Sequence, residues 1–184
     1  MANPLTKLDF LTDLKTHIHK HNKVVAEVFK PLDDEQLNWR SNRKEWNILQ
    51  CFDHLNLTHE YYAPKIAGAL SEPKPTISSQ DLYKPSFWGW IYMNFAFNPK
   101  YSFPTIKEIT PQAGASHEVL DVYLTKQVTL VNILEQVGEI DLRRTPVPLE
   151  KGIKFNLGDC LKVLVYHDDL HFEQAKGIIA AMRS

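Results

Sequence analysis

Apolar residues recur every three to four positions in four long stretches of the chain. These stretches run from about Thr6 to Lys30, from Asn47 to Leu70, from Ser116 to Gly138 and from Asn156 to Met182. A period of 3.6 residues places the apolar side chains on one face, as is typical of helices packed around a shared core. No strand pattern or internal repeat stands out, so the sequence predicts an all-α fold.

Individual residues indicate where these helices begin and end. Pro31 should stop the first helix, because proline cannot donate the next backbone hydrogen bond. Asn47 and Gln50 have the spacing of a capping box at the start of the second helix. Pro64 lies inside that helix and predicts a kink. Gly138 is expected to cap the end of the third helix.

The links between the helices predict how they are connected. The link between the second and third helices is long and rich in proline, whereas the other two are shorter. A four-helix bundle with one long crossover between helices two and three accommodates this pattern. We therefore expect a single domain over residues 1–184.

The crossover contains the most apolar stretch of the chain, from Phe87 to Phe97. It predicts a short helix packed on the bundle, with aromatic side chains that cover the core. A homodimer contact or the wall of an apolar ligand pocket are the alternatives for this aromatic cluster. The mixed charges between Asp33 and Glu45 predict an exposed loop.

Charge and composition restrict the class of partner. The 184 residues carry a formal net charge of -1, from 21 basic and 22 acidic side chains, so no basic excess favours nucleic acid or a membrane surface. The start of the chain lacks the apolar run of a signal peptide, and we expect a cytoplasmic protein. Cys51 and Cys160 lie in apolar helical patterns and are expected as reduced core residues, not as a disulfide.

The candidate chemistry begins on the fourth helix, where His167 and His171 are four residues apart. This spacing places both imidazoles on one helix face, within reach of a single ion. The apolar stripe around them indicates that this face points inward, where each ring needs a partner for its N–H and its lone pair. A metal ion would meet that need. Asp168 and Asp169 are near, but the helix turns them partly away from the histidine face.

A third ligand has to come from another helix. His54 and His59 both lie on the second helix, and the first helix offers His17 and His21 as a rival pair with the same spacing of four. For that rival pair, a solvated or partly packed helix face is the simpler interpretation. Periodicity alone does not choose among these histidines.

Two segments resemble a known family. The stretch LDDEQLNWRSNRKEWNILQCFDHLNLTHEYY resembles the first conserved block of the DinB-like superfamily, and LGDCLKVLVYHDDLHFEQAKGI resembles its second block. The resemblance implies an up-down-down-up four-helix bundle, often dimeric, with a divalent-metal triad at His54, His167 and His171. The chain departs from a frequent family pattern at Leu170, where arginine is common.

The resemblance also implies a type of reaction. Zinc and nickel are the usual metals of the family, and relatives include transferases that use low-molecular-weight thiols and a mycothiol-dependent isomerase. We therefore expect metal-dependent transfer of a low-molecular-weight thiol to a small electrophilic substrate. With water in place of the thiol, the same three-histidine site would make a hydrolase. A non-catalytic, stress-associated binding module is the remaining alternative.

Overall fold

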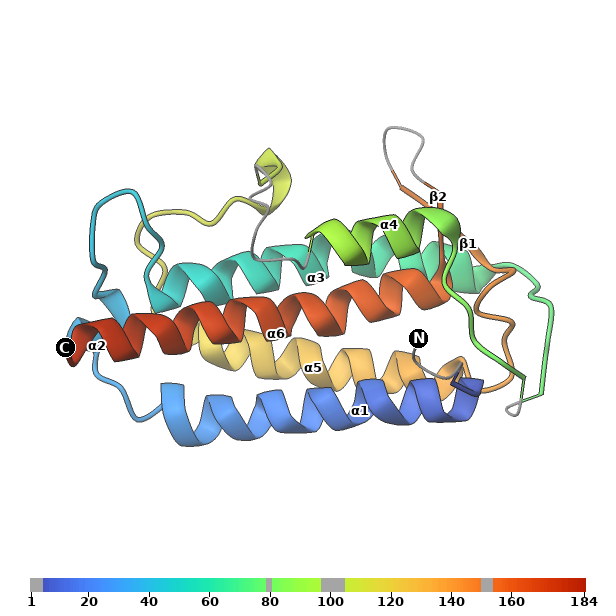
Figure 1. The fold of residues 1–184 in the computed structure, drawn as a ribbon, viewed down its shortest axis with the longest axis horizontal. Helices are drawn as coiled ribbons and strands as arrows, with labels where there is room; N and C mark the ends of the chain where they lie inside the picture. Colours follow the sequence, from blue (N-terminus) through green and yellow to red (C-terminus); the bar gives the residue numbers. More distant parts are fainter. Residues whose placement is uncertain (1–4, 79–80, 97–104, 150–153) are drawn as a thin grey trace.

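The structure is a computed structural model that describes residues 5–78, 81–96, 105–149 and 154–184 (Figure 1). Most of the described chain is helical, which confirms the all-α prediction. Four long helices lie side by side: α1 (Lys7–Val24), α3 (Ile48–Ser71), α5 (Glu118–Gln136) and α6 (Leu157–Met182). Both α1 and α3 pack against α5 and α6, so the four enclose a common interior.

The core consists of two apolar clusters at different heights along the helices. The cluster near the start of α6 includes Leu164, and the cluster near its end includes Phe172. Isolated β-bridges join Thr6 to Leu82 and Thr76 to Ile140. They tie together the start of α1, the segment after α3 and the segment after α5 at one end of the molecule, the right end in Figure 1.

The helix starts follow the capping chemistry in the sequence. The Asn47 side chain accepts from the backbone N–H of Gln50, and the Gln50 side chain accepts from the backbone N–H of Asn47, which confirms the capping box of α3. Asn156 and Asp159 form the same arrangement at the start of α6. These caps set where α3 and α6 begin.

The helix ends lie within one or two residues of the predicted positions. The first helix continues from α1 into a π-helical turn, Val25–Phe29, before Pro31. The second continues through Pro64 as far as Ser71, one residue beyond its predicted end at Leu70. The third ends at Gln136, just before the predicted glycine cap.

The connections contain elements that the sequence pattern did not reveal. A one-turn helix, α2 (Asp34–Asn38), lies in the segment predicted to be a loop, so that prediction was wrong there. Strands β1 (Pro146–Pro148) and β2 (Lys154–Asn156) pair antiparallel before α6, with buried Val147 opposite buried Phe155. Alternation over three residues is too short to be recognised as a strand pattern.

The aromatic crossover helix, α4 (Phe87–Ala96), has two different faces; Phe97 lies outside the described residues. On one face Gly89 is buried against α6, and the Tyr92 ring lies 5.4 Å from the Phe155 ring of β2. The helix therefore packs on the bundle as predicted. Its other face carries exposed aromatic side chains, those of Phe87, Trp88, Trp90 and Phe95.

No helix in the described ranges is long and apolar enough to cross a bilayer.

Cys51 and Cys160 are both buried and unpaired, as predicted. Burial raises the pKa of the Cys51 thiol to about 12, and burial followed by the charge of Asp159 raises the pKa of the Cys160 thiol further. Both thiols therefore stay protonated at neutral pH.

Candidate metal centre

Three histidines from two helices converge at one point in the structure. His54 extends from α3, and His167 and His171 extend from successive turns of α6. The Nε2 atom of His167 lies 3.3 Å from Nε2 of His54 and 3.2 Å from Nε2 of His171. The rings of His54 and His171 have centroids 4.6 Å apart. Of the two candidates on α3, the structure thus brings His54 to the α6 pair, and not His59.

The outer nitrogens of two of these rings are held by oxygen acceptors. Nδ1 of His54 lies 2.6 Å from the carbonyl oxygen of Ile109, and Nδ1 of His171 lies 2.8 Å from the side-chain oxygen of Gln174. A carbonyl oxygen can only accept, so each Nδ1 must donate its hydrogen. In a neutral ring the lone pair is then on Nε2, directed at the point where the three rings meet.

The environment of the triad keeps the imidazoles neutral. Burial lowers the pKa of His54, and burial together with the nearby His54 lowers the pKa of His171 to about 4. Burial, followed by repulsion from His171 and His54, places the pKa of His167 well below its usual range. Neutral imidazole is the form that binds metal ions, and these rings hold it at neutral pH without a proton having to be removed.

The spacing of the nitrogens fits a bound cation. Tetrahedral coordination with metal–nitrogen bonds of about 2.0–2.1 Å places ligand nitrogens about 3.3–3.4 Å apart. The two distances of 3.3 and 3.2 Å agree with that spacing. A single hydrogen on Nε2 of His167 could serve only one of its two neighbours, whereas a cation would satisfy all three lone pairs. His54 and His171 are buried, and His167 is partly exposed.

The surroundings of the triad come from the segment between α2 and α3 and from the crossover. The Trp46 ring stacks on His171 at 5.8 Å and lies 4.9 Å from His54, so it covers two of the three ligands. Ile109 belongs to η2 (Lys107–Ile109), a 3-10 turn of the crossover. The Thr58 hydroxyl donates to the backbone oxygen of His54, so it is used within the helix.

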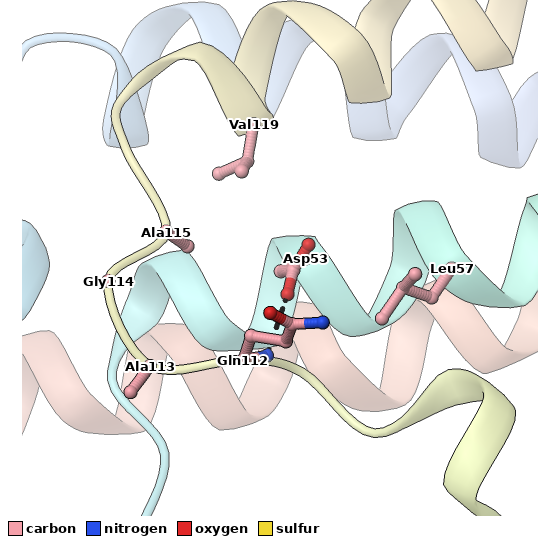
Figure 2. Close-up of a pocket in the computed structure, with 7 residues that line it drawn as sticks. All are labelled: Asp53, Leu57, Gln112, Ala113, Gly114, Ala115 and Val119. Atoms are coloured by element: carbon pink, nitrogen blue, oxygen red, sulfur yellow. Dashed lines mark hydrogen bonds between the residues drawn. The ribbon is translucent and has the colours of Figure 1, made fainter.

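A hollow of about 240 Å³ lies between α3 and the loop that leads into α5 (Figure 2). The Asp53 carboxylate accepts a 3.0 Å hydrogen bond from the backbone N–H of Gln112, which ties the loop to α3. The hollow is lined by Asp53, Leu57, Gln112, Ala113, Gly114, Ala115 and Val119. The three histidines are not among these lining residues, so the hollow is distinct from the metal centre.

Asp168 has a buried hydrogen-bonding role that the sequence analysis did not predict. It is fully buried and accepts 2.7 Å hydrogen bonds from the Tyr123 hydroxyl and from the Gln127 side-chain nitrogen. His59 lies 3.4 Å from the same carboxylate, so His59 is its partner and not a member of the triad. These residues form a polar layer between the two apolar clusters. The only signal in the sequence was a carboxylate four residues before Phe172 and four after Leu164 on the apolar side of the helix.

The rival pair on α1 also meets an acidic residue. His17 and His21 both contact Asp169 of α6, whereas His19 is exposed on the other side of α1. Partial burial disfavours the charged form of Asp169, but the hydrogen bonds and charges of His21 and His17 together lower its pKa. The interpretation of this pair as only a solvated or packed face is therefore incomplete.

Comparison with known proteins identifies the family. The sequence matches the family model of the DinB superfamily over residues 17–175, which confirms the resemblance and includes all three histidines of the triad. No curated protein and no solved structure matches the chain.

Proposed function

The chain belongs to the DinB superfamily, and from that premise we propose that it binds a divalent metal ion through His54, His167 and His171. The observation that carries this proposal is the convergence of the three Nε2 atoms, at distances of 3.2 and 3.3 Å, with two outer nitrogens held by acceptors. An all-nitrogen set of three imidazoles suits zinc or nickel. Packing of α1 and α3 against both α5 and α6 supports the family's up-down-down-up bundle as the scaffold.

The reaction we propose is transfer of a low-molecular-weight thiol to a small electrophilic substrate. When bound, the metal would supply a Lewis acid that keeps a coordinated thiol as thiolate at neutral pH. The residues of the chain present the lone pairs, fix the ring orientations through Ile109 and Gln174, and pack Trp46 against two of the rings.

The chain's own thiols support an external sulfur donor. Cys51 and Cys160 are buried, and their raised pKa values keep them protonated, so neither provides a nucleophilic thiolate. If sulfur is the nucleophile, it has to arrive with a small molecule.

Metal content and thiol dependence together test this function. Full-length protein without an affinity tag is loaded with Zn²⁺, dialysed and measured by elemental analysis, for the wild type, His171→Ala and His19→Ala. We expect His171→Ala to lose one equivalent of metal and the exposed His19→Ala control to lose none. Equal metal content in His171→Ala and the wild type would contradict the metal site.

The second arm of the test concerns the reaction. Zinc-loaded or nickel-loaded protein is mixed with a small thiol and an alkylating electrophile, and product is followed with and without the thiol. Product that forms only with the thiol supports the transferase. Turnover without thiol would contradict the transferase and support a hydrolase. If metal-loaded protein shows no turnover at all, the protein would be a non-catalytic binding module.

A further inference from the structure

A second group of ligating atoms lies on the opposite side of α6 from the triad, at the seam with α1. Nε2 of His21 lies 2.6 Å from one oxygen of Asp169, and Nδ1 of His17 lies 3.0 Å from the other. One nitrogen of each histidine and one carboxylate oxygen lie within 4.8 Å of one another. Two histidines four apart on one helix thus converge with a carboxylate from the neighbouring helix.

The cluster is partly sheltered and open to solvent on one side. The side chain of His21 is 5% exposed, whereas those of His17 and Asp169 are 23% and 39% exposed. His21 is held by packing, with its ring centroid 4.7 Å from that of Phe172. A hydrated cation can therefore reach the cluster, and at least one ligand is already fixed in place.

Each histidine has a second carboxylate behind it. Nε2 of His17, the nitrogen that points away from Asp169, lies 3.8 Å from Asp13. Nδ1 of His21, likewise the far nitrogen, lies 3.9 Å from the buried Asp168. At 3.8 and 3.9 Å neither contact is a hydrogen bond, but each carboxylate charge lies on the outer side of a histidine, where carboxylates commonly orient histidine ligands at metal sites.

The outer partners are themselves fixed. The Tyr166 hydroxyl donates a 2.6 Å hydrogen bond to Asp13, and the Tyr166 ring stacks on His17 with centroids 4.8 Å apart. Nδ1 of His21 is buried and makes no hydrogen bond to the described residues, since 3.9 Å is too long for one. Ordinary histidine–aspartate ion pairs account for the contacts of His17 and His21 with Asp169. They do not account for the two further carboxylates, those of Asp13 and Asp168, on the outer sides of the histidines.

We propose that His17, His21 and Asp169 form a second site for a divalent transition-metal ion, separate from the three-histidine centre. Two imidazoles and one carboxylate are a donor set that binds zinc with a coordination position left for water. The ion would replace the hydrogens shared between the histidines and Asp169. It would also join α1 to α6.

Counting zinc equivalents tests the second site without any measurement of activity. Metal-stripped, full-length, tag-free protein is titrated with Zn²⁺ by calorimetry, for the wild type, Asp169→Asn, His17→Ala and the exposed control His19→Ala. We expect two equivalents in the wild type and in His19→Ala, and one in the other two. Asp169→Asn preserves the shape of the side chain, and its circular dichroism and thermal unfolding establish that it is folded.

Variants of the two centres separate the two proposals. His171→Ala should keep the equivalent that Asp169→Asn loses, and Co²⁺ added to His171→Ala should produce visible absorption bands that Asp169→Asn abolishes in that background. Asp13→Asn should weaken this site without abolishing it, because it removes only a charge on the outer side of His17. The same zinc stoichiometry in the wild type and Asp169→Asn would overturn the second site, whatever His171→Ala shows. If Asp169→Asn loses a zinc equivalent and His171→Ala does not, the second site is supported and the three-histidine centre is contradicted.

Discussion

The Nδ1 atom of His54 donates a 2.6 Å hydrogen bond to the backbone oxygen of Ile109, a residue 55 positions further along the chain. This bond joins the long crossover to the centre of the candidate site. It also selects the tautomer of His54 that presents a lone pair to His167 and His171. The crossover is therefore part of the site and not only a connection between helices.

Removal of an outer hydrogen-bond acceptor should weaken metal binding without removing a ligand. Gln174→Leu deprives Nδ1 of His171 of its 2.8 Å partner. We expect zinc affinity at the three-histidine centre to fall by about 10- to 100-fold, measured by competition with a chromogenic chelator. The matched control is Glu173→Gln, an exposed neighbour that pairs with Lys176. Unchanged affinity in Gln174→Leu would show that the acceptor does not orient the ligand.

The stability of the metal-free protein should fall as the pH is lowered. In the folded protein the pKa of His171 is about 4, whereas its ordinary value is 6.5. Between these values the unfolded chain binds more protons than the folded one, so the free energy of unfolding decreases with decreasing pH. The slope is roughly 1.4 kcal/mol per pH unit for one proton, and it vanishes above pH 6.5 for this group.

Urea denaturation between pH 4 and pH 8, with a chelator present, measures this slope. His171→Gln removes one of the titrating groups and should give a shallower slope by about one proton. His19→Gln, which changes an exposed ring, should leave it as in the wild type. If the unfolding free energy depends on pH with the same slope in all three proteins, groups other than His171 cause the acid sensitivity.

The buried Asp168 should contribute strongly to stability. Asp168→Ala leaves the Tyr123 hydroxyl and the Gln127 amide without their shared acceptor inside the core. We expect the metal-free protein to lose roughly 3 kcal/mol of unfolding free energy, because unsatisfied buried donors are costly. Chemical denaturation of Asp168→Ala, Tyr123→Phe and the double variant measures the coupling. Additive losses would contradict a shared hydrogen-bond network.

Gly89 should be required where α4 meets the start of α6. A methyl group at this position would overlap with the Asp159 carboxylate, which also accepts a hydrogen bond from the backbone N–H of Ser86. Gly89→Ala should destabilise the protein by about 1–3 kcal/mol. Gly68→Ala is the control, since that methyl would meet no atom within 4 Å and should stabilise α3 by about 1 kcal/mol. Equal melting temperatures for both variants would contradict this packing.

The sequence by itself determined the features that depend on local geometry. Helical periodicity and capping residues located the long helices, because both act within one or two turns of the backbone. The pairing of His167 with His171 belongs to the same class, since four residues along a helix always place two side chains on one face. The family resemblance then singled out His54, which periodicity could not do.

Only the tertiary structure decided how these faces meet. His54 and His59 are both buried on α3, and the rotation of α3 against α6 brings one to the triad and the other to Asp168. The convergence of α1 on Asp169 depends in the same way on the packing of two helices far apart in the chain. Contacts of this kind arise from the fit of whole apolar faces, so the polar residues that lie between those faces meet partners that no local pattern specifies.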